Sequence, residues 1–241
     1  MRARPFLSDV SLKPSAQAFM NAFPFSLPVV RSLGTLPLHP RVSFFVGENG
    51  SGKSTLLEAI AVAMGFNAEG GGRNFNFATR ASHSALHEHL RLVRGIIPPR
   101  DGYFLRAESF YNVSTEIENL GVGKYYGGKS LHEQSHGEAF LTLFMERFGG
   151  KSFFVLDEPE AALSPQRQLA MLSRLHDLVR EGSQFLVATH SPILMAYPNA
   201  IIYECSAHGI CQVAYEDTEH YRVMHDFIAN PQRMLKVLLE D

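Results

Sequence analysis

Residues 47 to 55 read Gly47-Glu48-Asn49-Gly50-Ser51-Gly52-Lys53-Ser54-Thr55, and this run fits the phosphate-loop pattern G-x-x-x-x-G-K-[ST]. Glycines in such a loop let the backbone wind tightly, so that successive N–H groups face the phosphates of a nucleotide. In this pattern Lys53 reaches the β- and γ-phosphates, and Ser54 offers a hydroxyl to Mg²⁺. All nine residues are therefore candidates for binding ATP together with Mg²⁺.

The residues on either side predict the strand and the helix that a phosphate loop requires. The apolar run 42–46 indicates a short buried strand. After the loop, apolar residues recur at helical spacing from Leu56 to Met64, and Gly65 marks the end of that helix. Strand, glycine loop and helix N-terminus thus follow one another in the required order.

The length of 241 residues suits one large α/β domain or one domain with a small lobe, and 45% apolar content is enough for a real core. A formal net charge of -2 argues against a wholesale electrostatic grip on DNA or on an acidic membrane, but it leaves nucleic acid open as a partner. No apolar run approaches the roughly 20 residues of a membrane span, and the N-terminus leads into no signal-peptide core. We therefore expect a cytoplasmic protein without direct membrane insertion. Cys205 and Cys211 flank a predicted turn, and we expect reduced thiols there although a cross-strand disulfide is conceivable.

The remaining pattern predicts a largely parallel sheet. Strands are expected at 6–12, 25–30 and 102–106, and a helix is expected at 81–94. From residue 153 onward strand and helix alternate, through the segments 153–156, 165–180, 185–189 and 193–196. A hairpin at 201–204 and 210–215 follows, and two helices end the sequence. Asn230 is the expected N-cap of the second helix, with Pro231 at its first position.

Acidic and imidazole side chains stand where two of the buried strands end. Asp157 and Glu158 follow the apolar run 153–156, so the carboxyl edge of the sheet should present both acids. Asp157 is suited to hold Mg²⁺ through water, while Glu158, pointing to the other side, is the candidate general base for the attacking water. His190 ends the next apolar strand, where a lone histidine is most often structural but could here reach the γ-phosphate.

A second anion site is predicted at the start of the helix expected at 139–148. Ser135 and Gly137 stand at its N-terminus, where free N–H groups and the helix dipole favour negative charge. Taken alone, Ser135 is only an N-cap, and Glu138 completes a capping box three residues later.

In combination these residues resemble an ATP-binding-cassette (ABC) ATPase domain, from about Phe23 onward. Gly47 to Thr55, Ser135 to Glu138, Leu156 to Pro159 and His190 match its Walker A, signature, Walker B and switch-histidine motifs in order and spacing. Within that superfamily, the runs 157–165 and 188–192 look like the soluble, non-transport branch, often labelled AAA-family or predicted ATPases. That branch includes the ATPase parts of overcoming-lysogenization-defect nucleases and relatives of chromosome-maintenance ATPases.

The resemblance implies a fold and an activity. The fold is an α/β P-loop NTPase of the ABC type over residues 1–241, with a mainly parallel central sheet, an N-terminal antiparallel β part and a small helical signature lobe inserted at roughly 80–148. The activity is Mg-dependent ATP hydrolysis by a head-to-tail homodimer that forms on ATP binding. In that dimer, Ser135 and the Gly137 N–H of one subunit would touch the γ-phosphate bound by the other. Glu108 is the nearest candidate for the Q-loop residue, which couples Mg²⁺ and water to the smaller lobe.

The partner and the pathway of the protein are implied only by its resemblance to the soluble, non-transport branch. It implies an unidentified protein effector in DNA maintenance or anti-phage defence. The alternative is the ATP-binding subunit of an ABC transporter, and a small-molecule kinase is disfavoured because the signature and His190 would then be coincidences. The sequence departs from the transporter pattern at Glu138, at His136 and at Ser164, which replaces the D-loop aspartate. Phe23 and Phe25 are candidates for stacking on adenine, although core packing is the expected role of both.

Overall fold

The structure of the protein is a computed structural model that describes residues 4–72, 84–107, 115 and 136–239. Its centre is a seven-stranded sheet with the order β10-β9-β3-β8-β7-β6-β4. The strands are β3 (Val42–Val46), β4 (Gly71–Gly72), β6 (Gly102–Arg106), β7 (Phe153–Asp157), β8 (Gln184–Ala188), β9 (Ile201–Ser206) and β10 (Gly209–Val213). Neighbours from β9 through β6 pair in parallel, whereas β10 and β4 are antiparallel at the edges. The predicted mainly parallel sheet is confirmed.

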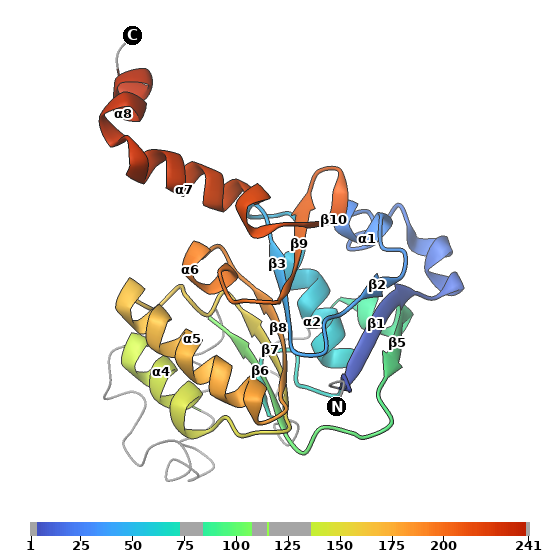
Figure 1. Ribbon diagram of the computed structural model, residues 1–241. Coiled ribbons are helices and arrows are strands. Elements are labelled where there is room, and N and C mark those ends of the chain that lie inside the picture. Colours follow the sequence, from blue (N-terminus) through green and yellow to red (C-terminus); the bar gives the residue numbers. More distant parts are fainter. Residues whose placement is uncertain (1–3, 73–83, 108–114, 116–135, 240–241) are drawn as a thin grey trace.

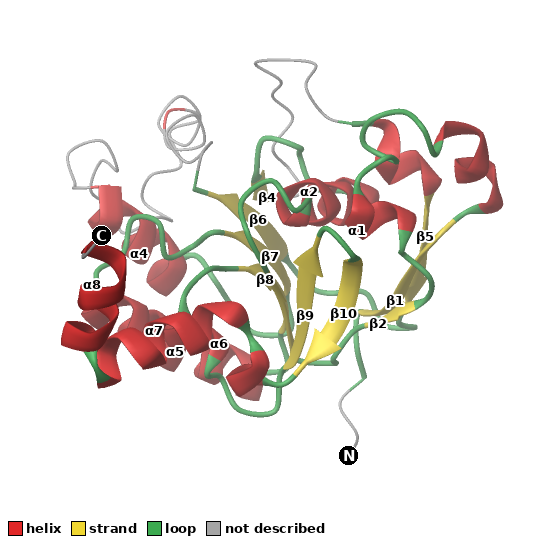
Figure 2. Cartoon of the chain, turned by 90° about the horizontal axis from the view of Figure 1, so that it is seen from above, coloured by secondary structure: helices red, strands yellow, loops and turns green. Residues whose placement is uncertain are grey.

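Helices cover both faces of this sheet (Figures 1 and 2). On one face lies α2 (Lys53–Ala63), and on the other lie α4 (His136–Glu146), α5 (Pro165–Arg180) and α6 (Pro192–Met195). Because side chains alternate along a strand, β7 serves both layers: Phe153 and Val155 belong to the core with α2, and Phe154 and Leu156 to the core with α4 and α5. The sheet is therefore buried on both faces, as a parallel sheet requires.

A second, antiparallel sheet at the N-terminus has the order β2-β1-β5. It consists of β1 (Leu7–Leu12), β2 (Leu36–Pro37) and β5 (Leu90–Arg94). The buried side chain of Gln184, on β8, ties the two sheets together: its oxygen accepts from the N–H groups of Phe6 and Leu7, and its amide donates to the Leu7 carbonyl. The N-terminal antiparallel part expected from the resemblance is thus present.

Two predicted elements are wrong. The segment 25–30 is not a strand, because Phe25 lies in a turn and the short helix α1 (Pro28–Arg31) begins at Pro28, whose fixed φ suits the first helical position. The segment expected as a helix at 81–94 is described from residue 84. It contains a 3-10 helix, η2 (Ala85–His89), followed by β5. There Leu90 and Leu92 pair with β1, so a contact between distant segments overrides the helical spacing.

The range expected for the small lobe contains elements of both sheets. Residues 90–94 and 102–106 are strands, and 136–146 form α4. Most of the rest of that range lies outside the described residues, so the limits of the lobe stay a prediction.

The C-terminal hairpin and the two final helices are confirmed. In the hairpin Cys205 pairs with Ile210 while Cys211 pairs with Glu204, and both thiols are free. Burial raises the pKa of the Cys205 thiol to about 12. The 3-10 helix η5 (Tyr215–Asp217) leads into α7 (Glu219–Ala229) and α8 (Pro231–Leu239), which extend away from the body (Figure 1). Asn230 caps α8 by accepting from the Arg233 N–H at 3.0 Å. None of the helices in the described part is long and apolar enough to span a bilayer.

Candidate nucleotide-binding site

The phosphate loop joins β3 to α2 and depends on glycine at two tight positions. Gly47 and Gly52 have φ values of 128° and 95°, a backbone region that other residues rarely adopt. A Cβ on Gly47 would lie 2.0 Å from the Cys205 oxygen, and one on Gly52 would lie 2.5 Å from the Val29 side chain. The loop therefore packs tightly between β9 and α1. This packing fixes the direction of its N–H groups.

Lys53 places a positive charge at the centre of this loop. Its side chain is buried, and its Nζ donates to the carbonyls of Gly47 at 2.6 Å and Glu48 at 2.8 Å. Burial lowers the pKa of the Lys53 ammonium. Lys53, Ser54 and Thr55 line a cavity of about 220 Å³ beside the loop, together with Phe23 and Glu158. Lys53 thus lines the space beside the loop, while its amine is held by the loop's own carbonyls.

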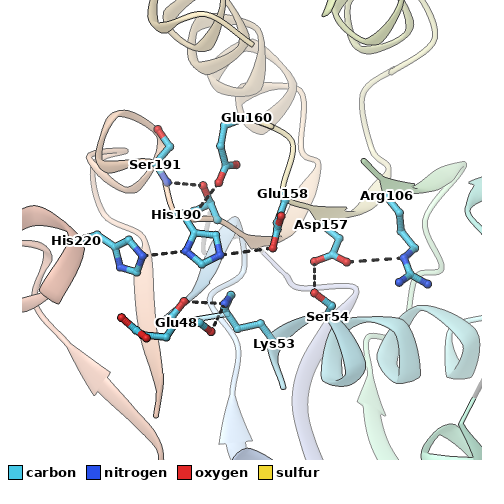
Figure 3. A network of polar contacts seen from close by, with 12 residues as sticks. Glu48, Lys53, Ser54, Arg106, Asp157, Glu158, Glu160, His190, Ser191 and His220 are labelled. Atoms are coloured by element: carbon cyan, nitrogen blue, oxygen red, sulfur yellow. Dashed lines mark hydrogen bonds and ion pairs between the residues drawn. The ribbon is translucent and has the colours of Figure 1, made fainter. Parts of the chain in front are cut away.

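Ser54 and Asp157 form the pair expected for magnesium (Figure 3). The Ser54 hydroxyl donates to Asp157 Oδ1 at 3.0 Å, and Asp157 is only 6% exposed. Mg²⁺ prefers such oxygen ligands and usually shares them with substrate phosphates and water. Within the described residues no group of three or more His, Cys, Asp or Glu could hold a metal by itself. The pair therefore fits an ion that arrives with the nucleotide.

Arg106, which the sequence reasoning missed, holds Asp157 from the other side. Its Nε lies 3.8 Å from Asp157 Oδ2, and its Nη1 lies 2.7 Å from Glu58 Oε2. Arg106 ends β6, directly beside Asp157 at the end of β7. No local motif distinguishes Arg106, a cation at a strand end, from an ordinary surface arginine.

Glu158 turns away from Asp157, toward His190. Its φ of 52° lies in the left-handed region, which is uncommon for a residue other than glycine, and its N–H donates to the Ala188 carbonyl at 3.0 Å. This turn brings Glu158 Oε1 to 3.4 Å from His190 Nε2. The two predicted catalytic residues are therefore neighbours at the ends of β7 and β8.

Two further residues, both missed, hold His190. The His190 N–H donates to Glu160 Oε1 at 2.6 Å, and His190 Nδ1 lies 2.9 Å from His220 Nε2. Burial raises the pKa of Glu160, and it lowers the pKa of both histidines, which nearby Lys53 lowers further. Glu160 stood in the acidic run after Asp157, which was a usable signal. His220 is 30 residues away on α7, and nothing local marked it.

The segment predicted to be the signature motif is described only in part. Ser135 and the Q-loop candidate Glu108 lie outside the described residues. Gly137, in the first turn of α4, packs so tightly that a Cβ would lie 2.2 Å from the Ala162 oxygen. Glu138 contacts Arg167 at 3.1 Å, which fixes the start of α4 against the first turn of α5. Ser164 is the N-cap of α5 and accepts from the Arg167 N–H at 3.4 Å.

The two aromatic candidates have different surroundings. Phe25 is buried and packs on Phe19 and His89, so core packing is confirmed for this residue. For Phe23 that expectation is wrong, because its side chain is 71% exposed and lines the cavity beside Lys53. Stacking of Phe23 on adenine stays a prediction.

Comparison with known proteins agrees with this geometry. A family model described as an AAA domain matches residues 27–121, and one described as "AAA domain, putative AbiEii toxin, Type IV TA system" matches residues 139–196. The thiamine import ATP-binding protein ThiQ of Cereibacter sphaeroides is 30% identical over 171 residues, which cover 61% of this chain and 69% of ThiQ. The ABC transporter G family member STR2 of Medicago truncatula is 26% identical over 171 residues, 63% of this chain. The chain spans 24% of the length of STR2 and 32% of that of the nucleoside import ATP-binding protein NupA of Lactococcus lactis.

Among solved structures, cbiO1 of Clostridium perfringens, part of the ABC transporter complex cbiONQ, is similar with a TM-score of 0.51. The similarity covers 95% of this chain and 97% of cbiO1 at 16% identity, so it shows the fold alone. The SMC head domain of Thermotoga maritima is similar with a TM-score of 0.46 and 19% identity, over 86% of this chain and 99% of that one. Since the match to ThiQ spans more than two thirds of that protein, the chain belongs to the ABC-type P-loop ATPases and is an ATPase.

Proposed function

We propose that the protein hydrolyses Mg-ATP as a head-to-tail homodimer that forms on ATP binding, and that this cycle drives a protein effector in the cytoplasm, in DNA maintenance or anti-phage defence. One observation supports the catalytic part above all others. Asp157, paired with Ser54, and Glu158, paired with His190, lie at the end of β7, and Glu158 lines the same cavity as Lys53.

Each of these residues has a distinct role in the proposed reaction. Lys53 neutralises the β- and γ-phosphates, and Ser54 and Asp157 hold the magnesium ion of the substrate, Asp157 through water. Glu158 accepts a proton from the attacking water while the water oxygen bonds to the γ-phosphorus, and ADP leaves with the bridging oxygen. His190 donates to the γ-phosphate and so senses whether it is present.

A second subunit is proposed because of where the described part of α4 lies. No residue of the described part of α4 lines the cavity beside Lys53. The N-terminus of α4, with Ser135 and Gly137, is the kind of anion site that a γ-phosphate requires. We infer that it meets the nucleotide of a partner subunit, which gives two composite sites in each dimer.

The proposal of a defence or maintenance role is supported by the second family model. That model covers residues 139–196, which include both catalytic candidates, and its description names a toxin of a type IV toxin–antitoxin system. A protein effector is also consistent with the exposed apolar side chains of α7 and α8, which include Val223, Met224, Ile228, Val237, Leu238 and Leu239. Nucleic acid stays open as a further partner.

The alternative, an ATP-binding subunit of a transporter, is favoured by the curated relatives, since ThiQ and NupA are import ATP-binding proteins. A pull-down from native cells with the ATP-trapped Glu158→Gln variant separates the two hypotheses. Recovery of a membrane permease would establish the transporter role, and recovery of a nuclease or a chromosome-associated protein would establish the other.

The composite site is tested by mixing two inactive variants, Lys53→Ala and Ser135→Arg. Neither should hydrolyse ATP alone. A heterodimer of the two retains one intact site, so an equimolar mixture with random pairing should recover at most about a quarter of the wild-type sites. A chain with both substitutions, mixed with Lys53→Ala, is the control and should recover nothing. Wild-type turnover by Ser135→Arg alone would show that the signature does not complete a neighbour's site.

A further inference from the structure

His220 contacts the switch histidine although it belongs to a different part of the chain. It is the second residue of α7, and its Nε2 lies 2.9 Å from Nδ1 of His190, with the ring centroids 5.0 Å apart. Figure 3 shows His220, His190 and Glu158 in a row, with the His190 ring between the other two side chains. In this row, the contact between two imidazole nitrogens links His190 to α7.

A neutral imidazole donates from one nitrogen and accepts at the other, so the contact has two arrangements. If His190 donated from Nδ1, its bare Nε2 would face the Glu158 carboxylate oxygen, 3.4 Å away. Two acceptors would then oppose each other. If His220 donates instead, His190 carries its proton on Nε2, and that N–H faces the carboxylate. Electrostatics therefore favours His220 as the donor.

The other nitrogens of the pair agree with this arrangement. Among the described residues, the buried His220 Nδ1 has no hydrogen-bond partner, whereas the buried His190 Nε2 has the Glu158 carboxylate 3.4 Å away. A buried acceptor without a partner is tolerated better than a buried donor without one, so His220 Nδ1 suits the bare nitrogen. The N–H on His190 Nε2 then faces Glu158 at the site. Burial and the Lys53 charge lower the pKa of both imidazoles, which favours a neutral pair.

We propose that His220 is a positioning residue, which donates its Nε2–H to His190 Nδ1 and thereby holds His190 in the Nε2–H tautomer that can donate to the γ-phosphate. This inference rests on the proposed role of His190 as the contact to the γ-phosphate. The same hydrogen bond ties the site to α7, whose first turn is fixed by Thr218 as N-cap and by the Glu219 N–H, which donates to Glu204. A displacement of the His190 ring would therefore act directly on α7, the helix that presents the exposed apolar side chains.

The tautomer can be measured by ¹⁵N NMR of histidine-labelled full-length protein, with the His190 signals assigned from a His190→Gln variant. In the wild type we expect a protonated Nε2 and a bare Nδ1 on His190. His220→Gln keeps an N–H donor near the same place, so it should preserve both the tautomer and kcat. His220→Leu removes the donor, so the Nδ1–H form should appear. His225→Ala, on the exposed side of the same helix, is the matched control and should change neither.

The kinetic effect separates this inference from the proposed role of His190. With His220→Leu we expect kcat to fall about 10- to 100-fold, the worth of one hydrogen bond to a charged group, with KM nearly unchanged. A changed tautomer with an unchanged kcat would support His220 as the positioning residue and contradict the γ-phosphate contact. A protonated Nδ1 on His190 in the wild type, or the same tautomer in His220→Leu, would overturn the inference.

Discussion

Replacing Glu158 with glutamine removes the proposed general base and keeps the shape of the side chain. The carboxylate is 37% exposed and lies 3.4 Å from His190 Nε2, a contact that the amide oxygen can retain. The free energy of unfolding should therefore change by less than about 0.5 kcal/mol. A positioned base contributes typically about 10²- to 10⁴-fold to the rate. At 1.36 kcal/mol for each factor of ten, this raises the barrier by about 2.7–5.4 kcal/mol. We expect kcat to fall by that factor, while ATP affinity stays within about threefold because Lys53 and the loop are intact.

The assay pairs equilibrium titration of a fluorescent ATP analogue with single-turnover release of phosphate. Glu146→Gln is the matched control, since this exposed glutamate at the end of α4 undergoes the same change of charge far from the strand ends. It should leave both affinity and turnover unchanged. Turnover of the Glu158→Gln protein near the wild-type rate would refute Glu158 as the base, and an equal loss of affinity would mean that the carboxylate acts in binding.

Three other variants test separate parts of the structure. Lys53→Ala should abolish productive ATP binding, which the same titration measures; saturable binding at near-normal affinity would contradict its role. Gly137→Ala places a methyl group 2.2 Å from a backbone oxygen, so it should lower the free energy of unfolding by about 1–3 kcal/mol and reduce turnover, whereas Gly149→Ala enters open space and should do neither in urea melts. The folded-state pKa of His190 and of His220 is lowered, so the folded state binds fewer protons and stability should fall as pH drops below about 6.5. His220→Gln should weaken that pH dependence between pH 7.5 and 5.5, and an unchanged slope would contradict it.

Much of the site could be predicted from local sequence, because its parts are strand ends and a loop whose backbone can adopt few conformations. The loop at 47–55 and the acids after β7 could be placed without a structure, since a parallel sheet brings carboxyl ends to one edge. Arg106 and His220 could not, because each acts through a neighbour that is distant in sequence. The same cause explains the error at β5, where pairing of Leu90 and Leu92 with β1 outweighs a helical spacing that is locally valid.

The turn at Phe23 shows a different limit. The residues around it are apolar, so burial was expected for Phe23 as well as for Phe25. Which of two aromatics faces the core depends on the backbone direction between them, and hydrophobicity alone does not specify that direction. The fold class depended on many residues acting together and was correctly predicted, whereas the orientation of one side chain was not.

The proposed ATP-gated dimer is tested most directly by light scattering on the Glu158→Gln protein with Mg-ATP, with Mg-ADP and without nucleotide. The γ-phosphate would be a shared anion between Lys53 of one chain and the α4 N-terminus of the other, so binding it should stabilise the dimer. We predict the mass of a stable dimer with Mg-ATP, and a mass near 26.8 kDa, or a weak dimer, in the other two conditions. The same mass in all three conditions would contradict the ATP-gated dimer, although it would leave the ATPase activity itself in place.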